Sequence, residues 1–465
     1  MYMFKPDDFK NKKGLVIGAG KSGIACANLL NEKGFSILLT EQQPKEKISE
    51  RLKNLNQGIM AETGGHTDAV FSCAFAIKCP GLPHSNPLIK ALEKHNIPIF
   101  SEIETALAFA DRPFLLGITG TNGKTTTAML LGNIMKKHAE ASGLDAETAG
   151  NIGTPLSDAV RKIRPGSFIT AELSSYQLED STFVRPEVSA VLNITPDHLE
   201  HHGSMEKYIE AKARIMLNQD SSCFCVLNLD DPICRKMAKM TKAKNLWFSS
   251  LENAGVEKKA DACIDGEFLK FRFNGHEYKI KPPNLPGRHN MENAMAAGLM
   301  AFAAGANAGE IEHSFSVFKP VEHRIEPAGS VNGILFINDS KATNVDSTAV
   351  ALKAMPAGKK VWLILGGRDK GAPYAPLVPL IREKVKGIFM TGEAAPIISK
   401  QLSSLCASYQ RETVYEACRE IIKLGSNGDI ALFSPACSSF DQFKDYEDRG
   451  RKFKNFVKGL SNGQI

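Results

Sequence analysis

The sequence predicts an α/β protein of three domains, each built on a mostly parallel, wound sheet: a Rossmann-like N-terminal domain, a central domain with a P-loop, and a Rossmann-like C-terminal domain. Short β-branched and aliphatic runs alternate with helical patterns along the chain, which is typical of parallel sheets. Many of these runs end in glycine-rich or polar turns. The 465 residues are enough for about three domains of ordinary size.

The composition favours small-molecule chemistry. The 57 Lys and Arg residues against 51 Asp and Glu give a net charge of +6, without long runs of one sign. Neither a nucleic acid nor an anionic membrane is therefore required as a partner. No apolar run approaches the roughly 20 residues that cross a bilayer, so we expect no membrane insertion. Ten cysteines without a signal-peptide pattern are typical of reduced core thiols, which predicts a cytoplasmic protein.

The first strand and helix enclose a glycine-rich turn, in "LVIGAGKSGIACANLL". Gly18, Gly20 and Gly23 follow the pattern in which backbone amides approach a diphosphate at a helix N-terminus. A plain strand-to-helix turn without a ligand would give the same pattern. The next strand, "FSILLTEQ", places Glu41 near its end, and "AFAIKCPGLP" leaves Cys79–Gly81 at the end of another strand. Strand ends of this kind are where α/β sheets bind ligands.

The second domain begins near residue 109 and carries a phosphate-binding loop. The strand "FLLGIT" leads into Gly120–Thr125, which has the glycine-lysine-threonine core of a P-loop, although the strict pattern would place glycine at Ile118. The backbone amides can wrap phosphates, Lys124 can reach the terminal phosphates, and the Thr125 hydroxyl can bind Mg²⁺. Strands are also predicted in "SFITAEL", "VSAVLNIT", "CFCVLNLD" and "LWFSS".

The third domain starts near residue 321 and repeats the same arrangement. "ILFINDSKATN", "KVWLILGGRDKG", "KGIFMTGEAA" and "DIALFSPACSSFDQF" each read as a buried strand followed by a polar or glycine-rich turn. These strand ends can converge on one cleft. The predicted domain limits are 1–108, 109–320 and 321–465.

Possible metal ligands lie in the central domain. Glu172 follows a strong strand and offers oxygen ligands for Mg²⁺, although a solvated loop carboxylate would look the same. "NITPDHLEHHGS" places Asp197, His198, His201 and His202 at a strand end, but no cysteine pair or HExxH pattern supports zinc, and one histidine on Mg²⁺ or Mn²⁺ is feasible. Lys212, in "YIEAKARIML", is by its residues alone an ordinary lysine on a helix surface.

Five segments, "GITGTNGKTTT", "AGNIG", "NITPDHLEHHGS", "LPGRHNMENAMAA" and "NDSKATN", together resemble the Mur ligases, ATP-dependent enzymes that build the peptide of bacterial cell-wall precursors. The resemblance covers nearly the entire chain. "AELSSYQLE", "DSKATN" and "SPACSSFDQFKDYEDRG" are similar to the member of the family that adds D-glutamate to UDP-N-acetylmuramoyl-L-alanine. The resemblance implies a UDP-sugar rather than NAD on the first domain, ATP on the second, and a third domain that closes over ATP and the amino acid.

The resemblance also implies a role for particular residues. The UDP-sugar is expected at Gly20, Lys21, Ser22, Glu41, Gln42 and Gly81, although "TEQQP" departs from the acidic, threonine and arginine run of some relatives. ATP is expected at Gly120, Thr121, Asn122, Gly123, Lys124, Thr125, Thr126, Asn290, Asn293, Arg324 and Asp339. Two Mg²⁺ ions are expected at Thr125, Glu172, His198 and Lys212, with Lys212 carbamylated so that it offers an anionic oxygen. Asn151 and Gln177 are expected to contact the UDP-linked substrate, and Lys341, Thr343, Lys370, Ser439 and Phe440 to frame D-glutamate.

The implied reaction forms an amide in two steps, with Lys124, His198 and Lys212 as catalytic residues. The L-alanyl carboxylate attacks the γ-phosphate of ATP, and the amine of D-glutamate attacks the resulting acyl phosphate. We expect a monomer in which residues near 318 to 323 act as a hinge. Other possibilities are another Mur-type or folylpolyglutamate-type ligase, a nucleotide-switched binding protein, and an NAD-dependent oxidoreductase built on Gly18–Gly23.

Overall fold

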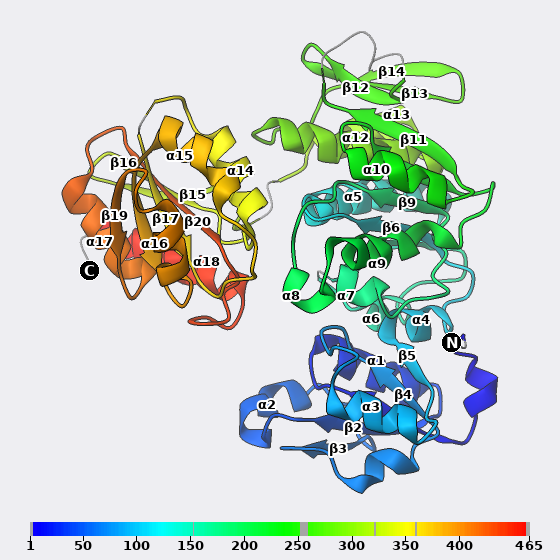
Figure 1. Ribbon diagram of the computed structural model, residues 1–465. Coiled ribbons are helices and arrows are strands. Elements are labelled where there is room, and N and C mark those ends of the chain that lie inside the picture. Colours follow the sequence, from blue (N-terminus) through cyan, green and yellow to red (C-terminus); the bar gives the residue numbers. More distant parts are fainter. Residues whose placement is uncertain (1–2, 152, 252–258, 320–321, 359, 462–465) are drawn as a thin grey trace. The chain divides into compact units, whose positions relative to one another are not determined.

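The computed structural model describes residues 3–151, 153–251, 259–319, 322–358 and 360–461 (Figure 1). Contacts between residues divide the chain into two compact units. The first contains Met1–Ile194, Glu206–Pro283 and Asn290–Phe318. The second contains Thr195–Met205, Asn284–His289 and Lys319–Ile465.

The first unit begins with a five-stranded parallel sheet of order β3-β2-β1-β4-β5. The strand order reverses between β1 and β4, so the loops that follow these two strands meet at the point where α/β sheets bind ligands. The strands are β1 (Lys13–Ile17), β2 (Ser36–Glu41), β3 (Met60–Thr63), β4 (Phe75–Lys78) and β5 (Ile99–Ser101). The helices are η1 (Pro6–Phe9), α1 (Lys21–Glu32), α2 (Lys45–Leu52), η2 (Asp68–Ser72), α3 (Pro87–Lys94) and α4 (Glu102–Leu107).

A nine-stranded sheet of order β14-β13-β12-β11-β10-β9-β6-β8-β7 follows in the same unit. Its strands pair in parallel from β7 to β12, and β13 and β14 extend it as antiparallel strands. The strands are β6 (Phe114–Thr119), β7 (Ala146–Gly150), β8 (Phe168–Glu172), β9 (Val188–Val191), β10 (Phe224–Asn228), β11 (Lys244–Ser249), β12 (Ala262–Asp265), β13 (Phe268–Phe273) and β14 (His276–Ile280).

Helices of very different length accompany this second sheet. The longest, α5 (Lys124–Ser142), begins directly after the phosphate-binding loop and ends at Gly143, whose positive φ of 64° terminates it in the left-handed conformation. The others are α6 (Leu156–Ala159), α7 (Ser175–Leu178), α9 (Met205–Leu217), α10 (Pro232–Met237), η3 (Ala238–Met240), α12 (Arg288–Ala303) and α13 (Ala308–Ser316). The short helix α8 (Leu199–His202) belongs to the second unit.

The second unit is built on a six-stranded sheet of order β15-β16-β20-β17-β18-β19, in which only the edge strand β15 is antiparallel. The strands are β15 (Glu326–Val331), β16 (Ile334–Asn338), β17 (Val361–Gly366), β18 (Val385–Thr391), β19 (Ala407–Gln410) and β20 (Ile430–Ala436). The helices are α14 (Val345–Ala354), η4 (Ala375–Leu377), α15 (Val378–Lys384), α16 (Ala395–Leu402), α17 (Val414–Leu424) and α18 (Tyr446–Ser461).

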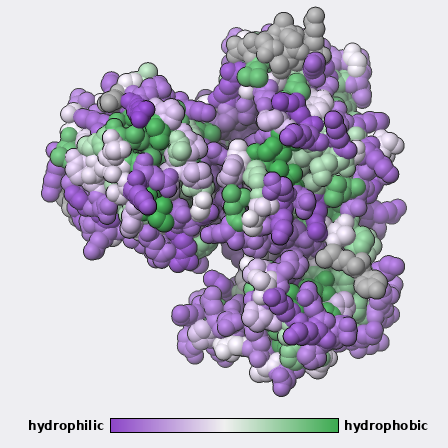
Figure 2. Space-filling view, viewed as in Figure 1, coloured by the Kyte–Doolittle hydropathy of each residue, from purple (hydrophilic) through white to green (hydrophobic). Residues whose placement is uncertain are grey.

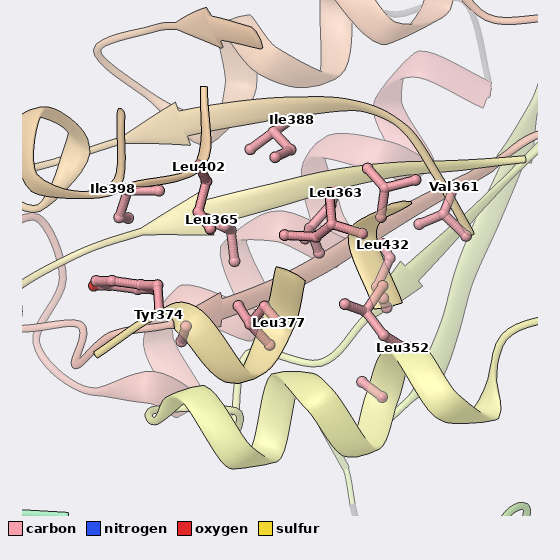
Figure 3. Close-up of a cluster of buried hydrophobic side chains, with 14 of the residues drawn as sticks. Leu352, Val361, Leu363, Leu365, Tyr374, Leu377, Ile388, Ile398, Leu402 and Leu432 are labelled. Carbon is pink, nitrogen blue, oxygen red and sulfur yellow. The ribbon is translucent and has the colours of Figure 1, made fainter. Parts of the chain in front are cut away.

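Strand β17 shows why the predicted strands of the second unit are continuously apolar. Leu363 and Leu365 face one cluster of buried side chains, which also contains Leu352 of α14 and Ile398 of α16 (Figure 3). Ile364 faces a second cluster on the opposite side of the sheet. Every residue of β17 is buried, as expected for a parallel strand with helices on both faces.

The predicted fold class is confirmed: three mostly parallel sheets follow one another along the chain. The antiparallel pairs of β12 to β14 were not anticipated, although Asp265–Gly266 and Asn274–Gly275 are dipeptides typical of hairpin turns. The domain limit near residue 108 stays a prediction, and the limit at 320 and 321 lies outside the described residues. All ten cysteines are free thiols, and all but Cys406 are buried.

The face of the molecule drawn as a space-filling view is mainly hydrophilic. In the face shown in Figure 2, hydrophobic residues form only small separate patches among hydrophilic ones, which is ordinary for a folded protein. In the described part of the chain, no helix combines the length and the apolar character needed to cross a membrane.

Candidate active site

The phosphate-binding loop connects β6 to α5, and its glycines are required by its shape. Gly120 and Gly123 have positive φ angles of 147° and 85°. A Cβ atom on Gly123 would lie 2.2 Å from Oδ1 of Asn293, so the loop leaves no room for a side chain there. Ile118, where the strict pattern wants glycine, is fully buried in β6 and pairs with neighbouring strands on both sides. The loop therefore starts after Thr119, and the departure from the pattern lies in the strand.

Asn193, which follows β9, holds the loop in place. Its Oδ1 accepts a hydrogen bond from the Asn122 amide at 2.8 Å, its Nδ2 donates to the Asn122 carbonyl at 3.1 Å, and its own carbonyl accepts from the Thr121 amide at 2.8 Å. The Thr121 hydroxyl lies 3.0 Å from the hydroxyl of Tyr208. The sequence reasoning missed Asn193 and Tyr208. Asn193 lies inside the predicted strand "VSAVLNIT", near its end, and this position was the available signal.

Lys124 folds back over the loop from the first turn of α5. Its Nζ donates to the carbonyl oxygens of Gly120 at 2.9 Å and Thr121 at 2.8 Å. Thr125 and Thr126, the next two residues of the helix, are buried. The loop thus combines a lysine cation, a hydroxyl and the N-terminus of a helix of 19 residues, the elements that bind phosphate in proteins.

Glu172, at the end of β8, is a buried carboxylate with one unused oxygen. Its side chain is 2% exposed, and Oε1 accepts from Nδ2 of Asn151 at 3.1 Å. Oε2 is buried without a hydrogen-bond partner among the described residues. A buried carboxylate oxygen of this kind is costly unless a cation or donor binds it. The interpretation of Glu172 as a solvated loop carboxylate is therefore wrong.

Lys212 on α9 is also buried, which corrects the interpretation of it as a helix-surface lysine. Its side chain is 1% exposed, and Nζ donates to the Gly120 carbonyl at 2.8 Å. The ammonium also lies 4.8 Å from the centre of the Tyr208 ring. The helical spacing alone could not reveal this, because the face of α9 that carries Lys212 packs against the phosphate-binding loop.

Two buried asparagines of α12 lie beside the same loop. Nδ2 of Asn293 donates to Oδ1 of Asn290 at 3.2 Å, and Oδ1 of Asn293 accepts from the Thr127 hydroxyl at 3.4 Å. The close approach of Asn293 to Gly123 fixes this part of α12 against the start of α5. The structure thus brings together the predicted nucleotide residues of the first unit.

The residues predicted for the UDP-sugar lie at the ends of neighbouring strands of the first sheet. Glu41 ends β2, where Oε2 accepts from the Ala19 amide at 2.8 Å and Oε1 from the Gln43 amide at 2.9 Å. Gly20 caps α1, and a Cβ on Gly23 would lie 1.9 Å from the Gly18 carbonyl oxygen. The remaining predicted residues of this group are Lys21 and Ser22 in the first turn of α1, Gln42 after β2, and Gly81 after β4.

Gln177 lies in the short helix α7, where its side chain is already engaged. Its Oε1 accepts from the amide of Ser174 at 3.0 Å, and the Gln177 amide donates to the Ser174 hydroxyl oxygen at 3.3 Å, which together form a capping box. The predicted contact of Gln177 with substrate stays a prediction.

In the second unit, the carboxylate of Asp197 lies close to two of the predicted residues, His198 and Lys370. Its Oδ2 accepts from Nδ2 of Asn344 at 3.0 Å, and its Oδ1 lies 3.4 Å from Nζ of Lys370. Nε2 of His198 lies 3.6 Å from Oδ2 of Asp197. His198 lies directly before α8. It has a positive φ of 53°, which is an uncommon conformation for a residue with a side chain. The sequence reasoning had noticed Asp197 but gave it no role, and it missed Asn344.

Asp339 follows β16 as a buried carboxylate. Its Oδ2 accepts from the Ser434 hydroxyl at 2.7 Å and its Oδ1 from the Ile325 amide at 3.2 Å. Burial raises the pKa of Asp339 to about 6, although the bond from Ser434 and the nearby Arg324 cation lower it. The loss of hydration on burial is the largest of these contributions.

Four of the five residues predicted to frame D-glutamate lie on two loops that Arg449 of α18 joins. Arg449 is buried and donates to the Ser340 carbonyl at 2.7 Å and to the Cys437 carbonyl at 3.2 Å. Lys341 and Thr343 follow the first of these anchors, and Ser439 and Phe440 follow the second. Nζ of Lys341 donates to the Tyr446 hydroxyl at 2.9 Å; Ser439 is buried, whereas Phe440 is 63% exposed.

The fold and the sites define a nucleotide-binding α/β protein of the ligase class, and the comparisons identify its family. Three family models match the chain: "Mur ligase MurD-like, N-terminal domain" over residues 12–101, "Mur ligase middle domain" over 118–301, and "Mur ligase, glutamate ligase domain" over 323–437. The chain belongs to the Mur ligase family.

Full-length relatives support this assignment. The chain is 45% identical to the UDP-N-acetylmuramoylalanine--D-glutamate ligase of Elusimicrobium minutum over 461 residues, covering 98% of this chain and 100% of the relative. It is 38% identical to the ligase of the same name from Koribacter versatilis, covering 98% and 99%. Among solved structures, UDP-N-acetylmuramate-alanine ligase MurC from Thermotoga maritima is similar in fold, with a TM-score of 0.60 and 19% identity, covering 97% of this chain and 100% of that one. The pseudomurein peptide ligase type C from Methanothermus fervidus has a TM-score of 0.59 and 18% identity, with the same coverage.

Proposed function

We propose that the chain is an ATP-dependent ligase that joins D-glutamate to UDP-N-acetylmuramoyl-L-alanine, releasing ADP and phosphate, in the synthesis of peptidoglycan precursors. The observation that carries this proposal is the phosphate-binding loop with two lysines and a buried, partly unpartnered carboxylate packed around it. The names of the full-length relatives, at 36 to 45% identity, support the choice of substrates.

Each domain has one part in this proposal. Residues 1–108 bind the UDP-sugar, 109–320 bind ATP, and 321–465 bind D-glutamate and close over the nucleotide. The UDP-sugar is assigned to Gly20, Lys21, Ser22, Glu41, Gln42 and Gly81, and the peptide end of the same substrate to Asn151 and Gln177. ATP is assigned to Gly120, Thr121, Asn122, Gly123, Lys124, Thr125, Thr126, Asn290, Asn293, Arg324 and Asp339.

The first chemical step brings two anions together. The L-alanyl carboxylate attacks the γ-phosphorus, the bond from that phosphorus to the bridging oxygen of ADP breaks, and an acyl phosphate forms. Lys124 and the loop amides offset the repulsion, since they place positive charge and donors where the phosphate oxygens gather. Holding both reactants in one orientation supplies much of the remaining acceleration.

Mg²⁺ is the metal that this donor set fits. The buried Oε2 of Glu172 and the Thr125 hydroxyl are hard oxygen ligands, and a cation would satisfy the carboxylate oxygen that has no partner among the described residues. We assign the metal sites to Thr125, Glu172, His198 and a carbamylated Lys212, with two ions. Bound Mg²⁺ would neutralise charge on the phosphate oxygens.

Carbamylation of Lys212 is part of the proposal. As an ammonium, Lys212 lies in the same small space as Lys124 and repels metal ions. Addition of CO₂ to the neutral amine, with loss of one proton, would convert it into a carboxylate. Burial supports this modification because desolvation of a lysine favours its neutral form.

In the second step, the amine of D-glutamate attacks the acyl phosphate carbonyl and phosphate leaves. D-glutamate carries two carboxylates, so its site should offer cations and hydroxyls, and we assign it to Lys341, Thr343, Lys370, Ser439 and Phe440. The attacking amine must lose a proton, and His198 beside Asp197 carries groups able to accept it.

We also infer that the enzyme acts as a monomer in the cytoplasm and that its third domain closes over ATP. The proposed hinge is near residues 318 to 323, of which 320 and 321 lie outside the described residues. Small-angle scattering should show a smaller radius of gyration with an ATP analogue and the UDP-linked substrate than without them. An unchanged radius would contradict closure.

A turnover assay tests the proposed function. ADP release should require UDP-N-acetylmuramoyl-L-alanine and D-glutamate together, and mass spectrometry should find their amide. Replacing D-glutamate by L-alanine, L-lysine or diaminopimelate should stop turnover. Turnover with one of these instead would indicate another Mur-type activity, and absence of ADP release with every amino acid would refute ligase activity.

A further inference from the structure

The loop that follows β4 is fastened at both ends by one carboxylate, that of Asp180. Lys78, the last residue of β4, places Nζ 2.8 Å from each of the two carboxylate oxygens of Asp180. His84, after the loop, places Nε2 3.0 Å from Oδ1 of the same group. The five residues between these two anchors, residues 79–83, include Gly81, with a positive φ of 97°.

The two partners come from different parts of the first unit. Lys78 belongs to the first sheet, whereas Asp180 lies two residues beyond α7, next to the second sheet, and 102 residues along the chain from Lys78. Residues 79–83 lie at the reversal point of the first sheet, to which the proposed function assigns UDP. α7 carries Gln177 and follows β8, which ends with Glu172. Asp180 therefore links the loop that is assigned to UDP to the segment that is assigned to the peptide end of the same substrate.

Lys78, His84 and Asp180 form a cluster in which the ion pair of Lys78 with Asp180 is almost completely buried. Lys78 is 1% exposed and the Asp180 side chain 8% exposed, while His84 remains about half exposed. The hydrogen bond to Asp180 raises the pKa of His84, so the carboxylate faces one lysine cation and an imidazole with an increased tendency to be protonated. Buried ion pairs add little net stability, because the loss of hydration offsets their attraction. The pair consequently acts more on geometry than on stability.

Other contacts join the same two parts of the unit without touching the loop. The hydroxyls of Ser101 and Ser181 lie 3.3 Å apart, and Oε1 of Glu104 accepts from the Phe183 amide. Oε1 of Glu102 accepts from the amide of Ser157 at 2.9 Å. These contacts would remain if Asp180 were changed.

A cavity lies beside the cluster. It has a volume of about 530 Å³ and is lined by Lys78, His84 and Asp180 together with apolar side chains that include Ile89 and Phe100. On this side the two ends of the loop border a cavity instead of a packed core. The contacts to Asp180 therefore restrain the side chains of Lys78 and His84 there, whereas the backbone of Lys78 is held by the pairing of β4 with β1 and β5.

We propose that Asp180 is a positioning residue for the UDP-linked substrate: by holding residues 79–83 at both ends, it fixes the nucleotide loop relative to α7 and so sets how far the reacting carboxylate reaches. This inference rests on the proposed function. It predicts an effect on one substrate among three, since ATP and D-glutamate are assigned to residues that Asp180 does not contact.

The test compares Asp180→Asn with Ser181→Ala, a neighbouring change that removes a hydroxyl contact of the same interface but leaves the loop fastened. Asp180→Asn should raise the KM for UDP-N-acetylmuramoyl-L-alanine about tenfold, while the KM values for ATP and D-glutamate change less than twofold. Ser181→Ala should leave all three KM values near those of the unchanged protein. Equal effects of both variants on all three substrates would overturn the proposal.

A double variant separates positioning from stability. Lys78→Met combined with Asp180→Leu removes both charges and replaces them by apolar side chains, so its melting temperature should equal or exceed that of the unchanged protein. The KM for the UDP-linked substrate should nevertheless stay raised, because the loop is no longer fastened. A double variant with a normal KM would show that Asp180 acts only through stability, and would refute the proposal. If the unchanged protein did not turn over this substrate at all, the proposed function would fail first.

Discussion

Lys124 and Lys212, which belong to different helices, donate hydrogen bonds to the same acceptor, the carbonyl oxygen of Gly120, at 2.9 and 2.8 Å. Two ammonium groups that share one acceptor repel each other, and the repulsion is strong where water is scarce. An incoming phosphate anion would relieve it, and so would conversion of Lys212 into a carbamate. The pair thus connects phosphate binding to the chemical state of Lys212.

Lys124→Ala should abolish most of the activity while leaving the fold intact. The loss of a cation aimed at the phosphates should lower kcat at least about 100-fold, the order found when a transition-state donor is removed. Lys136→Ala is the matched control, because Lys136 is exposed on the same helix. Steady-state ADP release measures both variants. Near-normal turnover of Lys124→Ala would refute its phosphate role.

Lys212→Ala tests the carbamate. The variant should lose about 10- to 100-fold in kcat, and short-chain carboxylates such as acetate or formate should restore much of this loss by occupying the vacated space. Added chloride at the same ionic strength should restore nothing, which makes it the control. If carboxylates fail to rescue an otherwise folded variant, the carbamate assignment is weakened.

Gly123→Ala should be much more harmful than Gly143→Ala. Both glycines flank α5 with positive φ angles, so each alanine costs about 1–2 kcal/mol of backbone strain. The Cβ at position 123 would also lie 2.2 Å from Oδ1 of Asn293, whereas position 143 has open space around it. Thermal unfolding and ATP titration should show additional destabilisation and weaker ATP binding for Gly123→Ala only. Equal effects would contradict the shape assigned to the loop.

Asp339→Asn should stabilise the ligand-free protein at neutral and higher pH. Burial raises the pKa of Asp339 from 3.8 to about 6, so the native state binds this proton more tightly than the unfolded chain does. The stability from this group is complete below about pH 4 and is lost as the pH rises to about 6, which amounts to about 3 kcal/mol at most. Asparagine does not ionise, so the variant avoids this loss of stability. Its free energy of unfolding should exceed that of the unchanged protein at pH 8 and should equal it near pH 4. Urea unfolding at several pH values measures it.

Asp429→Asn provides a control of opposite sign in the same unit. Burial raises the pKa of Asp429, but hydrogen bonds from Lys386, the Ser426 amide and Trp362 outweigh it, and the net pKa lies below 3.8. Its contribution to stability is present above the unfolded pKa and is lost as the pH falls through the lower folded value. This variant should therefore lose stability at pH 8. A gain in stability at pH 8 for Asp429→Asn, or a loss for Asp339→Asn, would contradict these assignments.

The order of strands and glycine-rich turns was predictable because each depends on neighbouring residues. Gly120 and Gly123 could be placed in a phosphate-binding loop from the strand before them and the lysine after them. The antiparallel pairs of β12 to β14 were missed although Asp265–Gly266 and Asn274–Gly275 carry a local hairpin signal, because the alternation of strands with helices elsewhere in the chain favoured a parallel sheet. Asn193 was missed for a different reason: its hydrogen bonds to Thr121 and Asn122 cross more than 70 residues of sequence.

The sequence by itself determined the α/β class, the succession of three sheets and the loop that can hold phosphate, since periodicity and turn chemistry are local properties of the chain. Only the tertiary structure decided which charged side chains are buried. Lys212, Glu172 and the pair of Lys78 with Asp180 look like ordinary polar residues along the chain, and they become special only when packing removes water and brings distant partners within hydrogen-bond distance. Burial depends on the whole fold, and for that reason no short stretch of residues could reveal it.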